Sequence, residues 1–267
     1  MTAGPDFRTD IIANRRIEYR LIGEPDPASP ALVFLHEGLG CTALWRDFPD
    51  RLCAATGLAG LVYSRQGYGG SDPCDLPRPL DYMEREACDV LPEVLAHFDI
   101  RKFILVGHSD GASIALIYTG LPDVKPAEGI IVMAPHVYVE DVSIAGIRAA
   151  KAAYEQGDLK RRLEKFHGNN TDCAFRGWND AWLNPAFLKW NIERFLPFCT
   201  IPVLAIQGRD DNYGTLAQIE TIKAAVSGSF DALILEKCGH GPWQEKPDEV
   251  LAASAHFIAG LVPKDVR

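Results

Sequence analysis

Residues 103–111 read Phe-Ile-Leu-Val-Gly-His-Ser-Asp-Gly, and this stretch decides the fold. Its first four residues are an apolar run, typical of a strand buried on both faces of a parallel sheet. The last five match Gly-x-Ser-x-Gly, and a helical run over 112–118 follows directly. Such a sharp turn from strand to helix strains the backbone of the residue at its centre, Ser109, and the glycines on either side relieve the crowding. The hydroxyl of Ser109 is therefore predicted to stand exposed over the sheet.

Other short apolar runs predict the remaining parallel strands, and they lie at 31–35, 58–63, 130–133, 203–206 and 232–235. Residues 16–22 alternate apolar and polar side chains instead, which indicates a half-exposed edge strand. Apolar residues at helical spacing predict helices over 83–98 and 248–261, with a kink or early end at Pro92. Strands alternating with helices indicate an α/β fold.

One region interrupts this alternation. Residues 142–198 contain no convincing strand but two or three helical segments, and they hold three of the five tryptophans, Trp178, Trp182 and Trp190. We interpret the region as a helical cap inserted after the strand that ends near Met133. The predicted division is a core of residues 1–141 and 199–267, with a cap of residues 142–198.

The residues after two later strands supply partners for Ser109. A serine hydroxyl is a weak nucleophile that needs an adjacent base, which is itself oriented by a third group. Gly-Arg-Asp-Asp at 208–211 and Cys-Gly-His-Gly at 238–241 each follow a predicted strand, at the edge where open α/β sheets place their sites. We predict His240 as the general base and Asp211 as the residue that orients it, with Asp210 as the alternative.

Stabilisation of an oxyanion requires two further donors. The first expected donor is the backbone N–H of Asp110, next to the nucleophile. The second is expected from the loop at 36–40, His-Glu-Gly-Leu-Gly, where Gly38 lets the backbone approach a substrate closely. Position 40 is glycine, so the loop does not complete a His-Glu-x-x-His zinc motif. No metal site is expected.

Composition limits the partners of the chain. Its 267 residues are enough for one α/β domain with an insert. The formal net charge of −9 argues against binding to nucleic acid or to an anionic membrane surface. No apolar run approaches the roughly 18 residues needed to span a bilayer. The seven scattered cysteines suit reduced thiols, and residues 1–12 show no secretory signal. We expect a cytoplasmic monomer or homodimer that acts on a small molecule.

By these residues the chain resembles the α/β-hydrolase superfamily. The loop at 36–40 is similar to the His-Gly-Gly-Pro-Gly oxyanion loop of proline iminopeptidase-like members, but it departs at Glu37 and Leu39. Residues 63–71 resemble the family's Asp-x-x-Gly-x-Gly-x-Ser turn, with Ser64 in place of the aspartate, and residues 239–247 look like its histidine loop. The resemblance implies eight strands, a helical cap after the sixth strand, and no cofactor.

The same resemblance implies esterase, lactonase, thioesterase, amidase or carbon–carbon bond hydrolase activity. We expect cleavage of a small apolar or aromatic ester, lactone or thioester through an acyl-enzyme, with Trp178 and Trp182 lining the pocket. The alternatives are a carbon–carbon hydrolase or cofactor-free oxygenase on the same scaffold, and a non-catalytic ligand receptor. Biphenyl hydrolase-like members carry an aspartate at the position of Asp110, whose carboxylate could favour a cationic amine or could cap the following helix.

Overall fold

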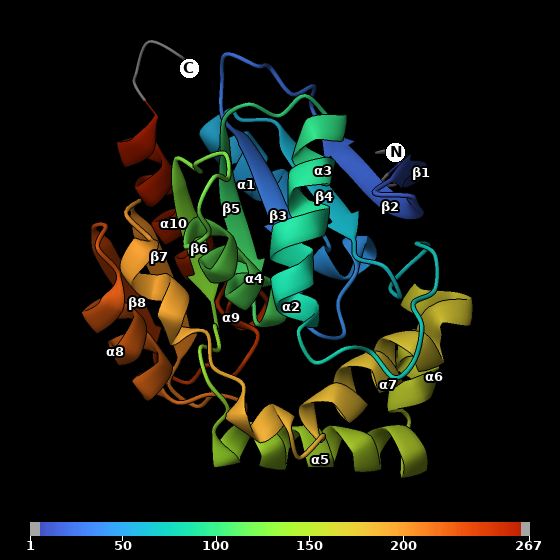
Figure 1. The fold of residues 1–267 in the computed structure, drawn as a ribbon. Helices are drawn as coiled ribbons and strands as arrows, with labels where there is room; N and C mark the ends of the chain where they lie inside the picture. The colour runs from blue at the N-terminus through green and yellow to red at the C-terminus, as the bar shows by residue number, and fades with distance from the viewer. Residues whose placement is uncertain (1–5, 263–267) are drawn as a thin grey trace.

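Eight strands form one sheet in the computed structural model, which describes residues 6–262. The strands lie in the order β1-β2-β4-β3-β5-β6-β7-β8 (Figure 1). β2 is antiparallel to both of its neighbours, β1 and β4, and the pairs from β4 to β8 are all parallel. The expected α/β class with a mostly parallel eight-stranded sheet is confirmed. Their bounds are β1 Arg8–Ile12, β2 Arg15–Ile22, β3 Ala31–Leu35, β4 Gly60–Ser64, β5 Phe103–His108, β6 Gly129–Met133, β7 Val203–Gly208 and β8 Phe230–Leu235.

Helices cover both faces of this sheet, so its central strands are buried on both sides. One face carries the short 3-10 turn Thr42–Trp45 and the helices α1 (Phe48–Thr56), α9 (Pro242–Glu245) and α10 (Pro247–Leu261). The other face carries α2 (Tyr82–Arg85), α3 (Leu91–His97), α4 (Asp110–Thr119) and α8 (Leu216–Ala225).

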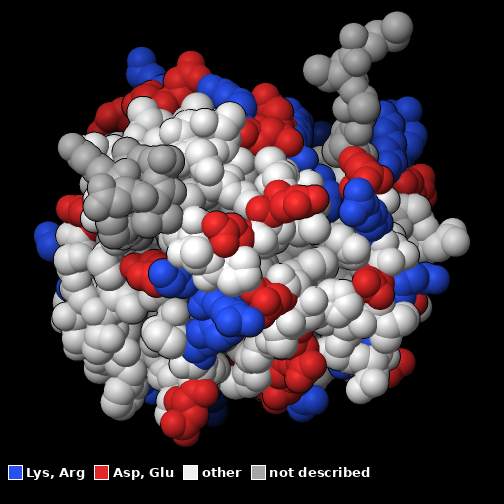
Figure 2. All heavy atoms as spheres, turned by 90° about the horizontal axis from the view of Figure 1, so that it is seen from above, with Lys and Arg blue, Asp and Glu red and all other residues white. Residues whose placement is uncertain are grey.

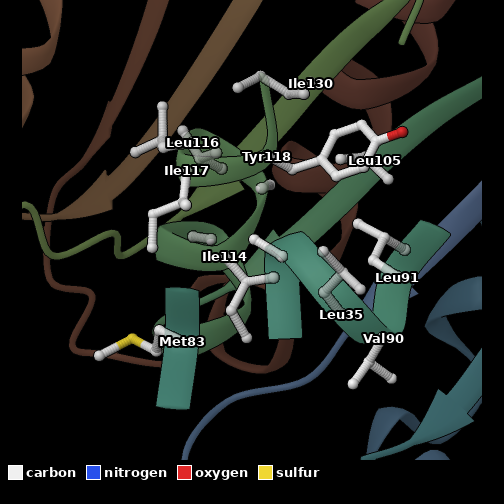
Figure 3. Packing of buried hydrophobic residues seen from close by; sticks show 14 of the residues in the cluster. Leu35, Met83, Val90, Leu91, Leu105, Ile114, Leu116, Ile117, Tyr118 and Ile130 are labelled. Carbon is white, nitrogen blue, oxygen red and sulfur yellow. The ribbon is translucent and has the colours of Figure 1, made fainter. Parts of the chain in front are cut away.

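Successive side chains of a strand point to opposite faces, and here both faces meet apolar helices. Leu35, Leu105 and Ile130 come from three neighbouring strands and pack in one cluster with Ile114 of α4 and Leu91 of α3 (Figure 3). Burial of such side chains contributes about 1.5–3 kcal/mol each. This continuous burial explains why the strands read as uninterrupted apolar runs.

Two local predictions need correction or refinement. The strand predicted at 16–22 is β2, and it is not at the edge of the sheet, because β1 pairs along its outer side. Most of β1 is exposed, so no apolar pattern announced it. The helix predicted over 83–98 is interrupted by a π-helical turn, Glu86–Val90, directly before α3, which has Pro92 in its first turn. Proline lacks the N–H that would continue regular helical bonding, which accounts for the predicted break.

Residues 141–198, here called the helical insert, separate β6 from β7. The insert contains α5, α6 and α7, which lie together below the sheet in Figure 1, and its only pairing of strand type is an isolated bridge between Tyr138 and Asn191. Its helices are α5 (Asp141–Gln156), α6 (Leu159–His167) and α7 (Thr171–Trp182), with 3-10 turns at Gly168–Asn170, Phe187–Lys189 and Glu193–Phe198.

A carboxylate from β2 reaches the turn that follows β4. Glu18 Oε2 accepts hydrogen bonds from Ser64 Oγ and Thr42 Oγ1, each at 2.6 Å. The Glu18 backbone N–H donates to Ser71 Oγ at 2.9 Å, and Ser71 Oγ in turn donates to the carbonyl of Ser64 at 2.6 Å. The family's turn has an aspartate at the position of Ser64. In this chain Glu18 supplies a carboxylate there instead.

Among residues 6–262, no helix is both long and apolar enough to cross a membrane. On the face turned away from the helical insert, acidic and basic side chains are intermixed (Figure 2). The predicted absence of a signal segment concerns residues 1–12, of which 1–5 lie outside the described residues.

The turn from β5 to α4 is tight enough to demand glycine on both sides of Ser109. A Cβ added at Gly107 would overlap the backbone of Gly111, and a Cβ added at Gly111 would overlap the carbonyl of Leu35. Helix α4 therefore begins in direct backbone contact with β3 and β5.

We predict that Gly111→Ala destabilises the fold by about 1–3 kcal/mol or more, because the rigid carbonyl of Leu35 cannot move aside easily. Gly260→Ala is the matched control, since that helical glycine has no atom within 4 Å of the added Cβ, and we expect it to be neutral or stabilising. Urea unfolding of both variants measures the difference. Equal stability of the two would contradict the close approach.

Candidate active site

Ser109, His240 and Asp211 lie in one continuous chain of hydrogen bonds. His240 Nε2 is 2.9 Å from Ser109 Oγ, and His240 Nδ1 is 2.8 Å from Asp211 Oδ2. The three residues follow β5, β8 and β7, and parallel strands bring their carboxyl ends to a common edge. The structure therefore brings together the three side chains that the sequence singled out.

The carboxylate of Asp211 is held on several sides. Its oxygens accept hydrogen bonds from the backbone N–H of Tyr213 at 2.7 Å and from Gln207 Nε2 at 2.8 Å. Burial alone would raise the pKa of Asp211, but the hydrogen bond and charge of His240, with the Tyr213 N–H, lower it. Asp210, the alternative, is exposed, and His240 bonds Asp211 instead.

Ser109 has the backbone conformation expected of a strained turn. Its φ is 52° and its ψ is −117°, a region that residues with a Cβ rarely occupy. It stands at the N-terminus of α4, where the first N–H groups have no intrahelical acceptor and the helix dipole favours negative charge. The N–H of Asp110 belongs to this first turn, and Gly38 lines the same cavity as Ser109.

A cavity of about 100 Å³ opens beside Ser109. Both tryptophans predicted to line it do so, and Trp178 lies directly against Gly38. The rest of the lining is mostly apolar or aromatic, with one carboxylate, and comprises Glu37, Leu39, His136, Ser143, Ile147, Tyr213 and His240.

Several lining residues were missed by sequence reasoning. No loop motif surrounds His136 in the sequence, yet its ring lies 5.6 Å from that of His240 and 5.1 Å from that of Trp182. Burial lowers the pKa of His136 to about 3, which keeps the imidazole neutral. Its position three residues after β6, on the same sheet edge, was the available signal. Ser143 and Ile147 lie on α5 and carried no local signal.

The carboxylate of Asp110 does not reach the cavity. It is fully buried, accepts a hydrogen bond from the Tyr82 hydroxyl, and is absent from the lining. The hydroxyl of Tyr82 in turn accepts from Trp182 Nε1 at 3.1 Å. The structure therefore gives no support to recognition of a cationic substrate by Asp110, whose side chain instead links α4 to the helical insert.

A second imidazole joins the loops around the site. His108 Nε2 is 2.7 Å from the carbonyl oxygen of His240, and His108 Nδ1 is 3.4 Å from Glu37 Oε2. Burial lowers the pKa of His108, but the hydrogen bond and charge of Glu37 outweigh it and raise the value. Burial alone would raise the pKa of Glu37, but the same contact with His108 lowers it. His108 thereby ties the Glu37 loop to the His240 loop.

His36 is fully buried, and its ring bonds to backbone groups of two neighbouring loops. Its Nε2 accepts from the backbone N–H of Arg65 at 3.0 Å, and its Nδ1 is 2.7 Å from the carbonyl of Glu37. In the described part of the chain, no group of three or more His, Cys, Asp or Glu side chains is arranged to hold a metal ion.

Sequence comparison finds relatives along most of the chain. Residues 32–253 match the model of the alpha/beta hydrolase family. A proline iminopeptidase of Lactobacillus helveticus (strain DPC 4571) is 32% identical over 280 aligned positions, which cover 90% of this chain and 93% of the relative. Epoxide hydrolase A of Mycobacterium tuberculosis (strain ATCC 25618 / H37Rv) is 29% identical over 104 positions, 38% of this chain and 32% of that protein.

Solved structures share the fold at low sequence identity. The esterase EaEST from Exiguobacterium antarcticum superposes with a TM-score of 0.75 at 16% identity, over 96% of this chain and 99% of that chain. The proline iminopeptidase of Mycobacterium smegmatis gives a TM-score of 0.70 at 17% identity, over 96% and 98%. At such low sequence identity, the structural similarity shows only that the fold is shared.

We predict that Glu37→Gln lowers the pKa of His108, because it removes the negative charge that raises it. A raised native pKa contributes stability that is present below the unfolded value of about 6.5 and is lost as pH rises through the native value. Glu37→Gln should therefore lower the Tm more near about pH 6 than near about pH 9. NMR titration of the imidazoles and thermal unfolding at both pH values measure this.

The matched control is Glu155→Gln, which removes a half-exposed carboxylate on α5. It should leave the His108 titration unchanged. An unchanged His108 pKa in Glu37→Gln would refute the coupling.

Proposed function

This chain belongs to the alpha/beta hydrolase family, and we propose that it is a serine hydrolase that cleaves a small carboxylic ester, lactone or thioester through an acyl-enzyme. The observation that carries the proposal is the unbroken hydrogen-bond chain Ser109–His240–Asp211 beside an apolar cavity. A nucleophile, its base and the group that orients the base are all within bonding distance, as nucleophilic catalysis requires.

In the proposed reaction, Ser109 Oγ attacks the acyl carbon while its proton passes to His240 Nε2. Asp211 accepts the Nδ1–H of His240, which fixes the tautomer and stabilises the imidazolium that forms. The backbone N–H groups of Gly38 and Asp110 hold the developing oxyanion, and each such donor contributes about 2.7–4 kcal/mol of transition-state stabilisation. His240 then gives the proton to the leaving group, and water resolves the acyl-enzyme by the same route.

The cavity favours a small acyl group. Its volume of about 100 Å³ is below that of an apolar cavity of about 150 Å³ that binds benzene. Leu39, Ile147, Trp178 and Trp182 give it an apolar wall, and the helical insert acts as the cap that closes it. The carboxylate of Glu37 disfavours anionic acyl groups there.

Peptide hydrolysis is the second candidate. It is favoured by the Lactobacillus helveticus relative, a proline iminopeptidase that aligns with 90% of this chain. Glu37 lies in the cavity lining and provides a carboxylate that could attract the amino terminus of a peptide. Turnover of proline 4-nitroanilide, compared with a short p-nitrophenyl ester, separates the two candidates.

The alternatives from other classes use the same scaffold. A carbon–carbon hydrolase or cofactor-free oxygenase would turn over a vinylogous diketone or a quinolone in preference to esters, and a ligand receptor would turn over none of them. We also propose the cytoplasm as the location, which the seven free cysteines support, and a small molecule as the partner of a monomer or homodimer.

Ser109→Ala is expected to lower kcat for a short p-nitrophenyl ester by about 10⁴-fold or more, because the members of a triad act as a unit. The wild type should react with a fluorophosphonate at Ser109 and the variant should not. Retention of most activity by the variant would exclude an acyl-enzyme at this residue.

Asp211→Asn should lower kcat by about 10⁴-fold, because an amide cannot hold the required tautomer of His240. Asp210→Asn changes the same group one residue earlier, where the side chain is exposed, and should leave kcat within about twofold. Steady-state kinetics on one ester compares them. Equal losses would overturn the assignment of Asp211.

Trp178→Ala should raise kcat/KM for longer acyl chains by roughly tenfold relative to acetyl esters, because the indole closes the cavity. Trp190→Phe is the control, since Trp190 is in the same insert but outside the lining. A p-nitrophenyl ester series from acetyl to octanoyl measures the preference. An unshifted preference in Trp178→Ala would place the acyl group elsewhere.

A further inference from the structure

Two cysteines meet between the helical insert and the sheet domain. Cys74 lies in the loop between β4 and α2, which runs past α7 in Figure 1, and Cys173 lies in the first turn of α7. Their Sγ atoms are 3.0 Å apart although the residues are separated by 99 positions. We propose that Cys74 and Cys173 form a reversible dithiol–disulfide site that fastens α7 to the loop after β4.

The pair is reachable from solvent. Cys74 lines a cavity of about 240 Å³ that is separate from the cavity at Ser109 and is bordered by Arg15, Gln66, Arg78 and Tyr82. Both sulfur-bearing residues are half-buried, whereas Cys41, Cys53, Cys199 and Cys238 are buried. A small oxidant can therefore reach Cys74 from this cavity, whose lining does not include Cys173.

Arg78 places a positive charge beside the two cysteines. Its guanidinium is 7% exposed and donates from Nη2 to Cys74 Sγ at 3.1 Å. This guanidinium also donates to the carbonyl of Gln66 at 3.1 Å and rests on the rings of Tyr68 and Tyr82 at 4.9 and 5.3 Å. Among residues 6–262 its charge acts on the buried carboxyls of Glu86 and Asp110, but no carboxylate lies within ion-pair distance of it. A buried cation is costly without a counter-charge, and a thiolate at Cys74 supplies one.

The protonation of the pair follows from these contacts. The hydrogen bond from the Cys173 thiol and the charge of Arg78 lower the pKa of Cys74 against the effect of burial. The thiolate is the reactive form of cysteine. Cys74 is thus the attacking sulfur, and Cys173 is the resolving thiol that holds the shared proton.

The surrounding backbone holds the sulfurs in place. The backbone N–H of Cys74 donates to Cys173 Sγ at 3.2 Å. A Cβ added at Gly67, whose φ is +91°, would lie 2.8 Å from Cys74 Sγ and 2.7 Å from Arg78 Nη2. On α7, a Cβ at Gly177 would lie 2.9 Å from Arg78 Nε. Glycines on both sides therefore let the loop, the guanidinium and the helix meet closely.

The reaction with a peroxide balances as follows. The Cys74 thiolate attacks one peroxide oxygen, the O–O bond breaks, and the released hydroxide takes up a proton to leave water and a sulfenic acid. Cys173 Sγ then attacks the sulfenic sulfur, the S–S bond forms, the S–O bond breaks, and a second water leaves. In sum, two thiols and one hydrogen peroxide give one disulfide and two waters. Two molecules of a small thiol reverse the bond by two exchange steps, and they leave joined as one disulfide.

Closing this bond would act on the pocket through one helix. Helix α7 carries Trp178 and Trp182, which line the cavity beside Ser109. The disulfide would fix the first turn of that helix to the sheet domain and so restrict opening of the insert. Neither cysteine lines that cavity, so the reduced protein does not depend on them for its chemistry.

The test is to treat the full-length protein with hydrogen peroxide, block the remaining thiols, and map disulfides by mass spectrometry without reduction. The wild type should yield one crosslinked peptide pair joining Cys74 to Cys173, and dithiothreitol should remove it. Cys74→Ser and Cys173→Ser should each abolish the crosslink, while Cys173→Ser should accumulate a dimedone-reactive sulfenic acid at Cys74. Cys88→Ser, which removes an exposed cysteine, is the matched control and should crosslink like the wild type.

Two further measurements report the effect on the insert. Amide hydrogen exchange in α7 should slow on oxidation of the wild type, and the Tm should rise by roughly 5–15 °C, because the bond closes a loop of about 100 residues in the unfolded chain. Neither change should occur in Cys74→Ser. Oxidation at Cys88 or at buried cysteines with no Cys74–Cys173 crosslink would overturn the proposal, as would a crosslink that leaves α7 exchange unchanged. These readouts do not require ester turnover, so they stand apart from the proposed hydrolase activity.

Discussion

The bridge that His240 makes between Ser109 and Asp211 rests on the parallel register of β5, β7 and β8. Each residue follows the carboxyl end of a different strand, so the strands must be aligned before the side chains can meet. The apolar layers on both faces enforce that alignment, because slipping one strand by one residue would turn its buried side chains to the wrong face. Stability of the sheet and geometry of the site are therefore one constraint, and the strained turn at Ser109 is tolerated only because the packing around it is rigid.

Much of the sheet could be predicted from the sequence, since a strand buried on both faces has no choice but to be apolar. The inner parallel strands β3 to β7 were predictable in this way, and β8, a partly exposed strand at the edge, was predictable from a shorter apolar run. β1 was not, because four of its five residues are exposed and only Ile12 is buried in the core. That omission is why β2 was mistaken for the edge of the sheet. The order of the strands is likewise set by tertiary packing and is invisible in any single run of residues.

The candidate site likewise contains residues that the local sequence pattern selects and residues that it does not. Ser109, Asp211 and His240 lie in short glycine-flanked loops, so local pattern was enough to select them. Residues such as Ile147 enter the cavity from helices of the insert, and only the path of the chain brings them there. The carboxylate of Asp110 shows the opposite failure: its position beside the nucleophile suggested contact with substrate, yet its side chain points into the protein, where Tyr82 binds it. Sequence adjacency fixes where a backbone N–H lies but not where a side chain turns.

The hydrogen bonds of Glu18 connect the first hairpin to the loops around the site. β1 and β2 form an antiparallel margin of the sheet, the kind of segment commonly trimmed when a chain is shortened for crystallisation or fused to a tag. Yet Glu18 binds Thr42, directly after the loop that carries Gly38, and Ser64, directly before the loop that carries Cys74. Cutting at a point past residue 22 would remove the carboxylate that accepts from both buried hydroxyls and leave them no acceptor but each other. Shortened versions of the molecule are best begun upstream of β1, and comparisons between differently cut forms should treat the hairpin as part of the working core.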